Sequence, residues 1–490
     1  MATTTGQLTT RRVVNSASFR IRRPTTRASE QHLNTIDRER LSMSMAREQA
    51  LFRERHPTSR ALFDAGRDSL LYGVPMNWMV RWPGDHPVYV ADAEGARFTD
   101  VDGNEFVDFC LGDTGGMAGH APKPSVDAIS RQAGRGITLM LPTEDAAWVS
   151  HELARRFGVP YWSFALTATD ANRFAIRWAR HITGRSKILV HNHCYHGTVD
   201  ESFAELDDSG EVVDQPGNTG PPVPVRMTTR VVEINDLEAL ERELAPGDVA
   251  VCMFEPALTN IGIVLPDPGY WEGVRELCDR TGTLLLIDET HTISAGSGGA
   301  TEAWGLAPDI VTIGKTLGAG IPSAAYGMTE DVQRRIVETT EPDVIDVGGT
   351  GGTLAGNALS LAAMRATLGE VMTDEAFEGM IELGERFERG VHDVISSREL
   401  PWHVVRLGCR VEYLFRAEPA RNGAEAFQGQ DAELDPFIHL YLLNRGVLMT
   451  PFHNMALMSP ATTVEDVERH TEVFGQAADE LLGIAREGRP

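Results

Sequence analysis

Short apolar runs alternate with amphipathic segments from about Phe164 to Ile313. Four of these runs are almost free of polar residues: Ile188-Leu189-Val190, Val249-Ala250-Val251-Cys252-Met253-Phe254, Leu284-Leu285-Leu286-Ile287 and Ile310-Val311-Thr312-Ile313. A short apolar run without a period predicts a strand buried on both faces, which is typical of parallel sheets. Helical patterns over 237–244 and 270–281 separate the later runs. Strands that alternate with helices predict an α/β fold with a large, doubly wound, mostly parallel sheet.

The segments before and after this sheet predict a smaller α+β domain made from both ends of the chain. Helical patterns cover 35–66, 125–135, 144–157, 357–370, 374–397, 433–444 and 464–484. Short strands are predicted at 88–90, 97–100, 105–109, 404–406 and 410–415, and a loop rich in Gly and Pro at 206–226. We therefore divide the chain into a disordered arm (1–35), a first segment of the small domain (36–120), the large domain (121–360) and a C-terminal segment of the small domain (361–490).

Composition excludes several classes of partner. The 490 residues carry a net charge of −25, whereas nucleic acids and anionic membrane surfaces require a basic face. No apolar run approaches the roughly 18 residues of a membrane span. Five cysteines without a CxxC spacing argue against a disulfide framework and favour the reducing cytoplasm. Residues 1–29 are rich in Arg, Ser and Thr and contain no acid, as in a transit peptide, but they lack an apolar face, which favours a basic arm.

Two residues that could take part in catalysis follow neighbouring apolar runs. Asp288 ends the run at 284–287, and Lys315 follows the run at 310–313 after Gly314. Ligands of open parallel sheets lie at the carboxyl ends of the strands, so both side chains are expected in one crevice. Pyridoxal phosphate (PLP) requires a lysine amine for its aldehyde and an acid for its ring nitrogen. A lone acid at a strand end is more often a helix cap, but the pair favours a PLP site.

The sequence around this pair resembles the class III aminotransferases, which are fold-type-I PLP enzymes that include ω-transaminases and glutamate-1-semialdehyde aminomutases. The motifs are DET at 288–290 and IGKTLGAGIPSAAYG at 313–327, and the resemblance extends from about Leu62 to Leu482. It implies that Lys315 forms the Schiff base with PLP and that Asp288 pairs with the pyridine nitrogen. It also implies a homodimer whose active site is shared between subunits.

The resemblance implies further cofactor-binding residues. Tyr195, in Tyr195-His196-Gly197, is expected to stack on the pyridine ring, and a motif G-T-L-A-G-N-A places Thr353 at the phosphate of the neighbouring subunit. Ala168 and Thr169 lie where a strand opens into a helix, and the free amides and positive end of such a helix suit a phosphate. The family has S-G-T-E-A there, against T-A-T-D-A in this chain. The remaining members of the set are Glu255, which precedes Pro256, and Thr290.

The residues between His191 and His196 allow a second interpretation. His191, His193, Cys194 and His196 are close enough in sequence to suggest a metal site. We prefer the cofactor interpretation for this loop because the aromatic-His-Gly motif explains it, and we therefore predict no metal.

The sequence also predicts residues that bind the substrate. Trp78 aligns with an arginine that binds the substrate carboxylate in relatives acting on amino acids and glutamate 1-semialdehyde, and it offers an apolar wall instead. This favours a bulky or aromatic amine, or another arginine for a carboxylate, namely Arg81, Arg406 or Arg410. The leading hypothesis is an aminotransferase of the ω or β type with a carbonyl acceptor. One alternative is a glutamate-1-semialdehyde 2,1-aminomutase. Another is a catalytically silent relative or a domain that binds a different nucleotide, and the absence of GxGxxG after the first strand disfavours nucleotide binding.

Overall fold

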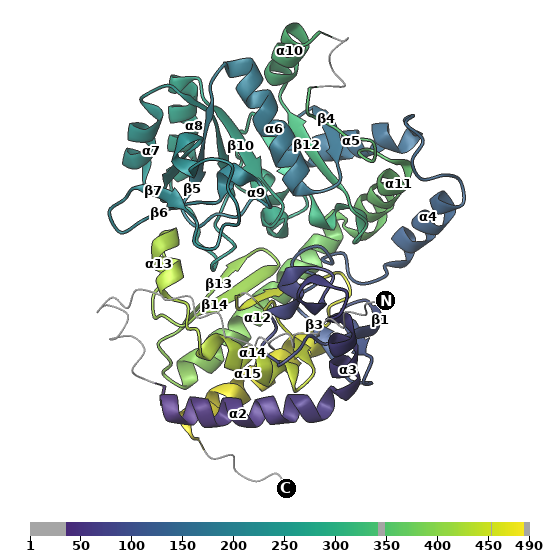
Figure 1. The fold of residues 1–490 in the computed structure, drawn as a ribbon, viewed down its shortest axis with the longest axis vertical. Coiled ribbons are helices and arrows are strands. Elements are labelled where there is room, and N and C mark those ends of the chain that lie inside the picture. Colours follow the sequence, from purple (N-terminus) through teal and green to yellow (C-terminus); the bar gives the residue numbers. More distant parts are fainter. Residues whose placement is uncertain (1–35, 342–347, 452, 485–490) are drawn as a thin grey trace, which may run out of the picture.

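The fold was analysed in a computed structural model, which describes residues 36–341, 348–451 and 453–484. The arm predicted for 1–35 lies outside the described residues. In Figure 1 the large domain occupies the upper half of the molecule, and the two ends of the described chain meet in the lower half. No helix among the described residues combines the length and apolar character needed to cross a bilayer.

The large domain is built on a seven-stranded sheet with the order β4-β12-β11-β10-β9-β5-β8. The strands are β4 (Tyr161–Ala165), β5 (Lys187–His191), β8 (Thr229–Val232), β9 (Val249–Phe254), β10 (Leu284–Asp288), β11 (Ile310–Ile313) and β12 (Ala324–Met328). The five strands from β8 to β11 pair in parallel, and β12 is antiparallel to both of its neighbours. Every residue of β9, β10 and β11 is buried, which explains their continuous apolar sequences.

Helices pack around this sheet (Figure 1). They include α5 (Glu144–Phe157), α6 (Ala168–Thr183), α7 (Leu237–Leu244), α8 (Tyr270–Thr281), α10 (Glu330–Thr339) and α11 (Ala358–Ala366). The α6 helix begins three residues after β4 and packs against β9, β11 and β12. Its first turn therefore lies at the same edge of the sheet as the ends of the parallel strands.

The small domain joins segments from both ends of the chain. One sheet consists of β1 (Val90–Glu94), β2 (Arg97–Asp100), β3 (Glu105–Asp108) and β15 (Val447–Leu448), and β3 and β15 pair in parallel. A second sheet consists of β13 (His403–Leu407), β14 (Arg410–Leu414) and β16 (Met455–Leu457). The helices α12 (Asp374–Ser397), α14 (Leu434–Leu443) and α15 (Val464–Leu482) complete the domain. The predicted α/β fold with a smaller α+β domain is confirmed.

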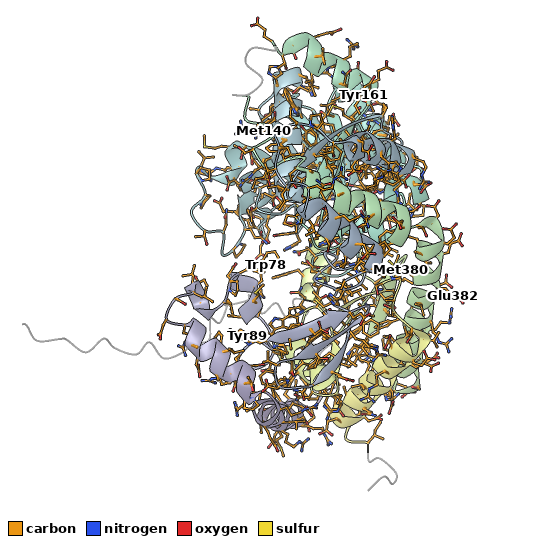
Figure 2. All side chains as sticks on the ribbon, turned by 90° about the vertical axis from the view of Figure 1, so that its right-hand side faces the viewer. Trp78, Tyr89, Met140, Tyr161, Met380 and Glu382 are labelled. Carbon is orange, nitrogen blue, oxygen red and sulfur yellow. The ribbon has the colours of Figure 1, made fainter. Side chains whose placement is uncertain are left out.

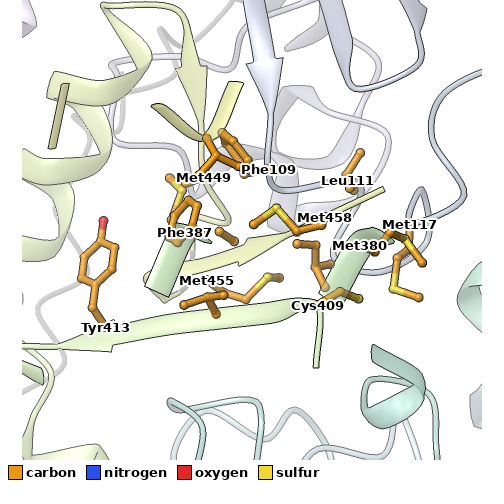
Figure 3. Close-up of a cluster of buried hydrophobic side chains, with 14 of the residues drawn as sticks. Phe109, Leu111, Met117, Met380, Phe387, Cys409, Tyr413, Met449, Met455 and Met458 are labelled. Carbon is orange, nitrogen blue, oxygen red and sulfur yellow. The ribbon is translucent and has the colours of Figure 1, made fainter. Parts of the chain in front are cut away.

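Apolar packing in the small domain also fixes the loop that follows β3. Figure 3 shows Phe109, Phe387, Met455 and Met458 in one buried cluster, with Leu111 and Met117 at its edge. Leu111 and Met117 are fully buried and flank the glycine-rich stretch at 112–116. This loop follows β3 and is therefore anchored on both sides of Asp113.

Three predicted elements differ from the structure. The single helix expected over 35–66 is two helices, α2 (Arg38–Arg55) and α3 (Pro57–Gly66), because Pro57 has no N–H to continue the first helix and instead starts the second. The first strand begins at Val90 instead of Val88. The segment predicted as a loop at 206–226 contributes to a hairpin of β6 (Ala204–Leu206) and β7 (Val212–Asp214).

Candidate active site

A cavity of about 250 Å³ lies at the carboxyl ends of the parallel strands. This volume is near the lower end of the roughly 300–1,000 Å³ that is typical of small-molecule sites. Its lining residues come from the ends of β5, β9, β10 and β11, from the start of α6 and from the N-terminal segment: Trp78, Leu166, Thr167, Ala168, Thr169, Tyr195, His196, Gly197, Glu255, Asp288, Thr290, His291, Lys315 and Ser323. The structure thus brings together seven of the predicted cofactor residues and Trp78.

Lys315 has an unusual backbone conformation. It follows β11 with a φ of 53°, in the left-handed region that residues other than glycine rarely adopt. The preceding Gly314 packs tightly on α6, since an added Cβ would lie 3.0 Å from both the Cβ and the N of Ala168. The Nζ atom of Lys315 donates a hydrogen bond to Asp113 Oδ2 at 2.8 Å and also contacts His291 Nε2.

Lys315 is also the lysine that borders the cavity. The sequence contains three lysines, and the other two form ion pairs elsewhere, Lys123 with Asp127 and Lys187 with Asp248. A cofactor that attaches to a lysine in this cavity therefore has one candidate among the described residues.

Asp288 is a buried, ionised carboxylate beneath the cavity. Its Oδ2 accepts hydrogen bonds from His196 Nδ1 at 2.9 Å and Asn172 Nδ2 at 2.8 Å, and its Oδ1 accepts from the backbone N–H of Thr290 at 3.1 Å. Burial alone would raise the pKa of Asp288. The hydrogen bond from His196, the charge of His196 and the hydrogen bonds from Thr290 and Asn172 instead lower this pKa to about 2. The carboxylate is therefore charged at neutral pH and suits a protonated ring nitrogen.

Two aromatic rings form one wall of the cavity. Tyr195 is held by its backbone N–H, which donates to Glu255 Oε1 at 3.2 Å. The rings of Trp78 and Tyr195 lie 5.7 Å apart at an interplanar angle of 60°, an edge-to-face contact. Figure 2 shows Trp78 on the side of the N-terminal segment that faces the large domain. Burial, followed by the charge of Asp113, raises the pKa of Tyr195 to about 12, so its hydroxyl remains protonated.

The first turn of α6 provides an anion site in the same cavity. Thr167 caps the helix by accepting a hydrogen bond from the N–H of Asp170 at 3.2 Å, and the amides of Ala168 and Thr169 occupy the first turn. The first amides of a helix have no acceptor within the helix, and they carry its positive end. Gly197 has a φ of 75° and contacts this turn so closely that a Cβ would lie 2.1 Å from Thr169 Oγ1. This arrangement suits a phosphate despite the departure from the family motif.

A half-buried carboxylate, Asp113, faces Lys315 and was not predicted. Its loop contains three residues other than glycine with left-handed φ angles, Leu111 (43°), Asp113 (51°) and Thr114 (78°). Burial would raise the pKa of Asp113, but the charge of Lys315, with smaller effects from His291, Arg410 and His453, holds it well below its usual range. The sequence contained one signal for this residue, the glycine-rich stretch from Gly112 to Gly119.

The three candidate arginines differ in their surroundings. Arg410 is fully buried and donates from Nη2 to the backbone O of Thr259 at 2.8 Å, whereas its Nε and Nη1 have no hydrogen-bond partner among the described residues. Arg406 forms ion pairs with Glu388 and Glu385. Arg81 is exposed, and none of the three arginines lines the cavity. Of the three, Arg410 is the one with unused donors.

Thr353 lies outside the Lys315 cavity of its own chain. It lines a neighbouring cavity of about 240 Å³ together with Gly351, Gly352 and Leu166, and Leu166 also borders the first cavity. The histidines near Cys194 diverge, because His191 bonds to the hydroxyl of Tyr270 whereas His196 bonds to Asp288. The described residues contain no group of three or more potential metal ligands.

Comparison with known proteins places this site in a family. The family model described as "Aminotransferase class-III" matches residues 80–477, and the chain therefore belongs to the class III aminotransferases. This confirms the family predicted from the motifs at Asp288 and Lys315.

Among its relatives, a glutamate-1-semialdehyde 2,1-aminomutase of Sorangium cellulosum (strain So ce56) is 33% identical over 424 residues, which cover 85% of this chain and 95% of the relative. A solved structure of a glutamate-1-semialdehyde aminomutase from Pseudomonas aeruginosa PAO1 is 50% identical with a TM-score of 0.90, and the match covers 91% of this chain and 100% of that one. An omega-transaminase from Sphaerobacter thermophilus is 25% identical with a TM-score of 0.78, and the match covers 86% and 97% of the two chains.

Proposed function

We propose that this chain is a PLP-dependent enzyme in which Lys315 carries the cofactor covalently and Asp288 pairs with its ring nitrogen. The observation that supports this most strongly is the single cavity bordered by both residues, at the ends of the adjacent strands β10 and β11. Membership of the class III family supports the same cofactor. A lysine-to-alanine variant of the Pseudomonas relative has been solved in complex with PMP, the amine form of PLP.

The residues present fit this cofactor. PLP, when bound, draws electrons away from the substrate carbon that bears the amino group. The ionised Asp288 would hold the proton of the ring nitrogen, Tyr195 would stack on the ring, and the amides of Ala168 and Thr169 would bind the phosphate. The buried hydroxyl of Thr290 has no partner among the described residues and lines the cavity, so it offers a further contact. Glu255 positions Tyr195 by accepting a hydrogen bond from the backbone N–H of Tyr195.

Lys315 has a second role once a substrate amine displaces it. Its free amine then acts as the general base that removes a proton from the substrate carbon and returns it at another atom. Asp113, 2.8 Å from Nζ, stabilises the ammonium that forms when Lys315 takes up this proton.

The comparisons favour the aminomutase alternative over the leading prediction of an aminotransferase. The aminomutase relatives match nearly the whole chain, at up to 50% identity, whereas the omega-transaminase matches at 25%. We therefore propose that the enzyme moves the amino group within one substrate of the glutamate 1-semialdehyde class, without a separate acceptor. Arg410 is proposed to bind the substrate carboxylate, because its Nε and Nη1 lack partners among the described residues.

An aminotransferase of the ω or β type remains the second candidate. The contact between Trp78 and Tyr195 gives the cavity an aromatic wall that would suit a bulky amine. In this case a keto acid or aldehyde would accept the amino group from the loaded cofactor.

The assembly and location of the enzyme are also proposals. We propose a cytoplasmic homodimer in which Thr353 contacts the cofactor phosphate of the neighbouring subunit, since within its own chain Thr353 lines a different cavity. The domain boundaries predicted near residues 120 and 360 are retained as a proposal as well.

One experiment separates the two reactions. The PLP-loaded full-length chain is incubated with glutamate 1-semialdehyde alone, and the isomer with the amino group moved from carbon 2 to carbon 1 is quantified over many turnovers. The aminomutase predicts continued turnover without any added carbonyl compound. An aminotransferase would consume one equivalent of the substrate per chain and then stop, and it would resume when an acceptor is added. Lys315→Ala is the control and should show neither behaviour.

A further inference from the structure

A continuous chain of hydrogen bonds connects Lys315 to the buried carboxyl group of Glu255. Lys315 Nζ contacts His291 Nε2, His291 Nδ1 lies 2.8 Å from Thr259 Oγ1, and Thr259 Oγ1 lies 2.5 Å from Glu255 Oε2. Thr259 does not line the cofactor cavity. It is fully buried between two titratable groups, which its hydroxyl connects.

The chemistry of the groups fixes the direction of this chain. The hydroxyl of Thr259 has one proton and donates it to Glu255 Oε2. Thr259 Oγ1 must then accept from His291 Nδ1–H, which places the lone pair of a neutral His291 on Nε2, facing the ammonium of Lys315. Every bond therefore points from Lys315 towards Glu255.

We propose that His291, Thr259 and Glu255 form a proton relay that takes up the proton Lys315 must lose before its amine can attack the cofactor or act as a base. The inference rests on the proposed role of Lys315 as the PLP lysine. In the relay a proton passes from Lys315 Nζ to His291 Nε2, the Nδ1 proton passes to Thr259 Oγ1, and the Thr259 proton passes to Glu255 Oε2. One proton moves in total, leaving a neutral amine, a neutral imidazole in its other tautomer and a protonated carboxyl group.

The surroundings suit both ends of the relay. The charged and titratable groups that influence His291 are Lys315, Asp113, Arg410 and His453, and burial together with Lys315 lowers the pKa of His291 well below its usual value, which keeps the ring neutral. His196 and Asp288 influence Glu255, and burial raises the pKa of Glu255 above its usual value. A carboxyl group that is easier to protonate is a suitable final acceptor.

Rigid backbone holds the middle of the relay. Leu258 exchanges two backbone hydrogen bonds with Val264, at 3.1 and 3.0 Å, and so fixes the position of the adjacent Thr259. Glu289 accepts hydrogen bonds from Thr292, Ala300 and Thr301, which fix the loop that carries His291. These contacts hold the His291 and Thr259 segments in place.

The test replaces the central hydroxyl. Thr259→Val keeps the shape of the side chain and removes the hydroxyl, whereas Thr259→Ser keeps the hydroxyl. The full-length chain, freed of PLP, is treated with an amine-selective acylating reagent at several pH values, and modification of each lysine is measured by mass spectrometry. Acylation requires the neutral amine, and the two lysines outside the cavity, Lys123 and Lys187, serve as internal references.

The relay predicts that Thr259→Val slows acylation of Lys315 about tenfold relative to Lys123 and Lys187 at neutral pH. Thr259→Ser should restore most of the wild-type rate, and Glu255→Gln should slow it like Thr259→Val. If Thr259→Val raises the reactivity of the reference lysines because the fold is lost, Glu255→Gln decides the question. If Lys315 is acylated at the wild-type rate in both Thr259→Val and Glu255→Gln, the relay is overturned.

Failure of the relay is distinguishable from failure of the proposed function. Attachment of PLP to Lys315 in the wild-type chain tests the function and does not depend on the relay variants. A wild-type chain that binds PLP at Lys315, with unchanged acylation in Thr259→Val, would retain the function and exclude the relay.

Discussion

Asp113→Asn is expected to make Lys315 more reactive, whereas loss of the relay makes it less reactive. The carboxylate lies 2.8 Å from Lys315 Nζ, and the side chain of Lys315 is 25% exposed. An opposite charge at this range attracts the ammonium group of Lys315. Because solvent screens part of this attraction, we expect its removal to change the reactivity of the Lys315 amine by about tenfold.

The assay is the competitive acylation described above, performed on the PLP-free chain at neutral pH. Asp113→Asn should accelerate acylation of Lys315 about tenfold relative to Lys187, since the amide keeps the size of the carboxylate and removes its charge. The surface pair of Lys123 and Asp127, at 2.7 Å, provides a matched control. Asp127→Asn should change acylation of Lys123 less than about twofold, because exposed ion pairs contribute little. An unchanged rate for Lys315 in folded Asp113→Asn would refute the electrostatic argument.

Four further predictions follow from the site. Asp288→Asn should lower kcat/KM by roughly 10²-fold or more while PLP remains attached, because the ring nitrogen loses its ionic partner. The measurement is steady-state kinetics at a known PLP content, and near wild-type activity would contradict the prediction. The hydrogen bonds that lower the pKa of Asp288 stabilise the fold fully at pH values above 3.8, and this stabilisation is lost as the pH falls towards about 2. The free energy of unfolding of the PLP-free protein, measured with denaturant, should therefore decrease by about 2 kcal/mol across that window, whereas that of Asp288→Asn should not. Arg410→Met should raise KM for a carboxylate substrate at least about tenfold and leave an amine without a carboxylate unaffected; equal effects on both would exclude Arg410 as the carboxylate site. Mixing inactive Lys315→Ala and Thr353→Ala chains under subunit exchange should restore about a quarter of the wild-type activity, since half of the dimers then contain one intact site; no recovery in exchanged dimers would contradict a shared site.

Much of the large domain could be predicted from the sequence. The runs at 249–254 and 310–313, and the helices at 237–244 and 270–281, have the predicted bounds because each is either continuously apolar or strongly amphipathic. The break between α2 and α3 was missed although Pro57 signals it. The hairpin of β6 and β7 was missed because its strands have three residues each and few apolar positions.

The site could be predicted only where strand ends reveal it. Asp288 and Lys315 follow buried strands, and the rule for parallel sheets places them together. Asp113 is 202 residues away from Lys315 in sequence, and their contact depends on how the small domain packs against the sheet. His291 lies three residues beyond Asp288, yet its role depends on Thr259 and Glu255, which come from another strand end. Long-range contacts of this kind leave no local pattern.

The most direct test of the proposed function is to locate PLP on the chain. The PLP-loaded protein is reduced with borohydride, which makes the link between the cofactor and its lysine permanent, and the modified peptide is identified by mass spectrometry. With only Lys123, Lys187 and Lys315 in the sequence, the result is unambiguous. We predict one modification per chain, at Lys315, and none in Lys315→Ala. Modification at Lys123 or Lys187, or none in the wild-type protein, would contradict the proposed function.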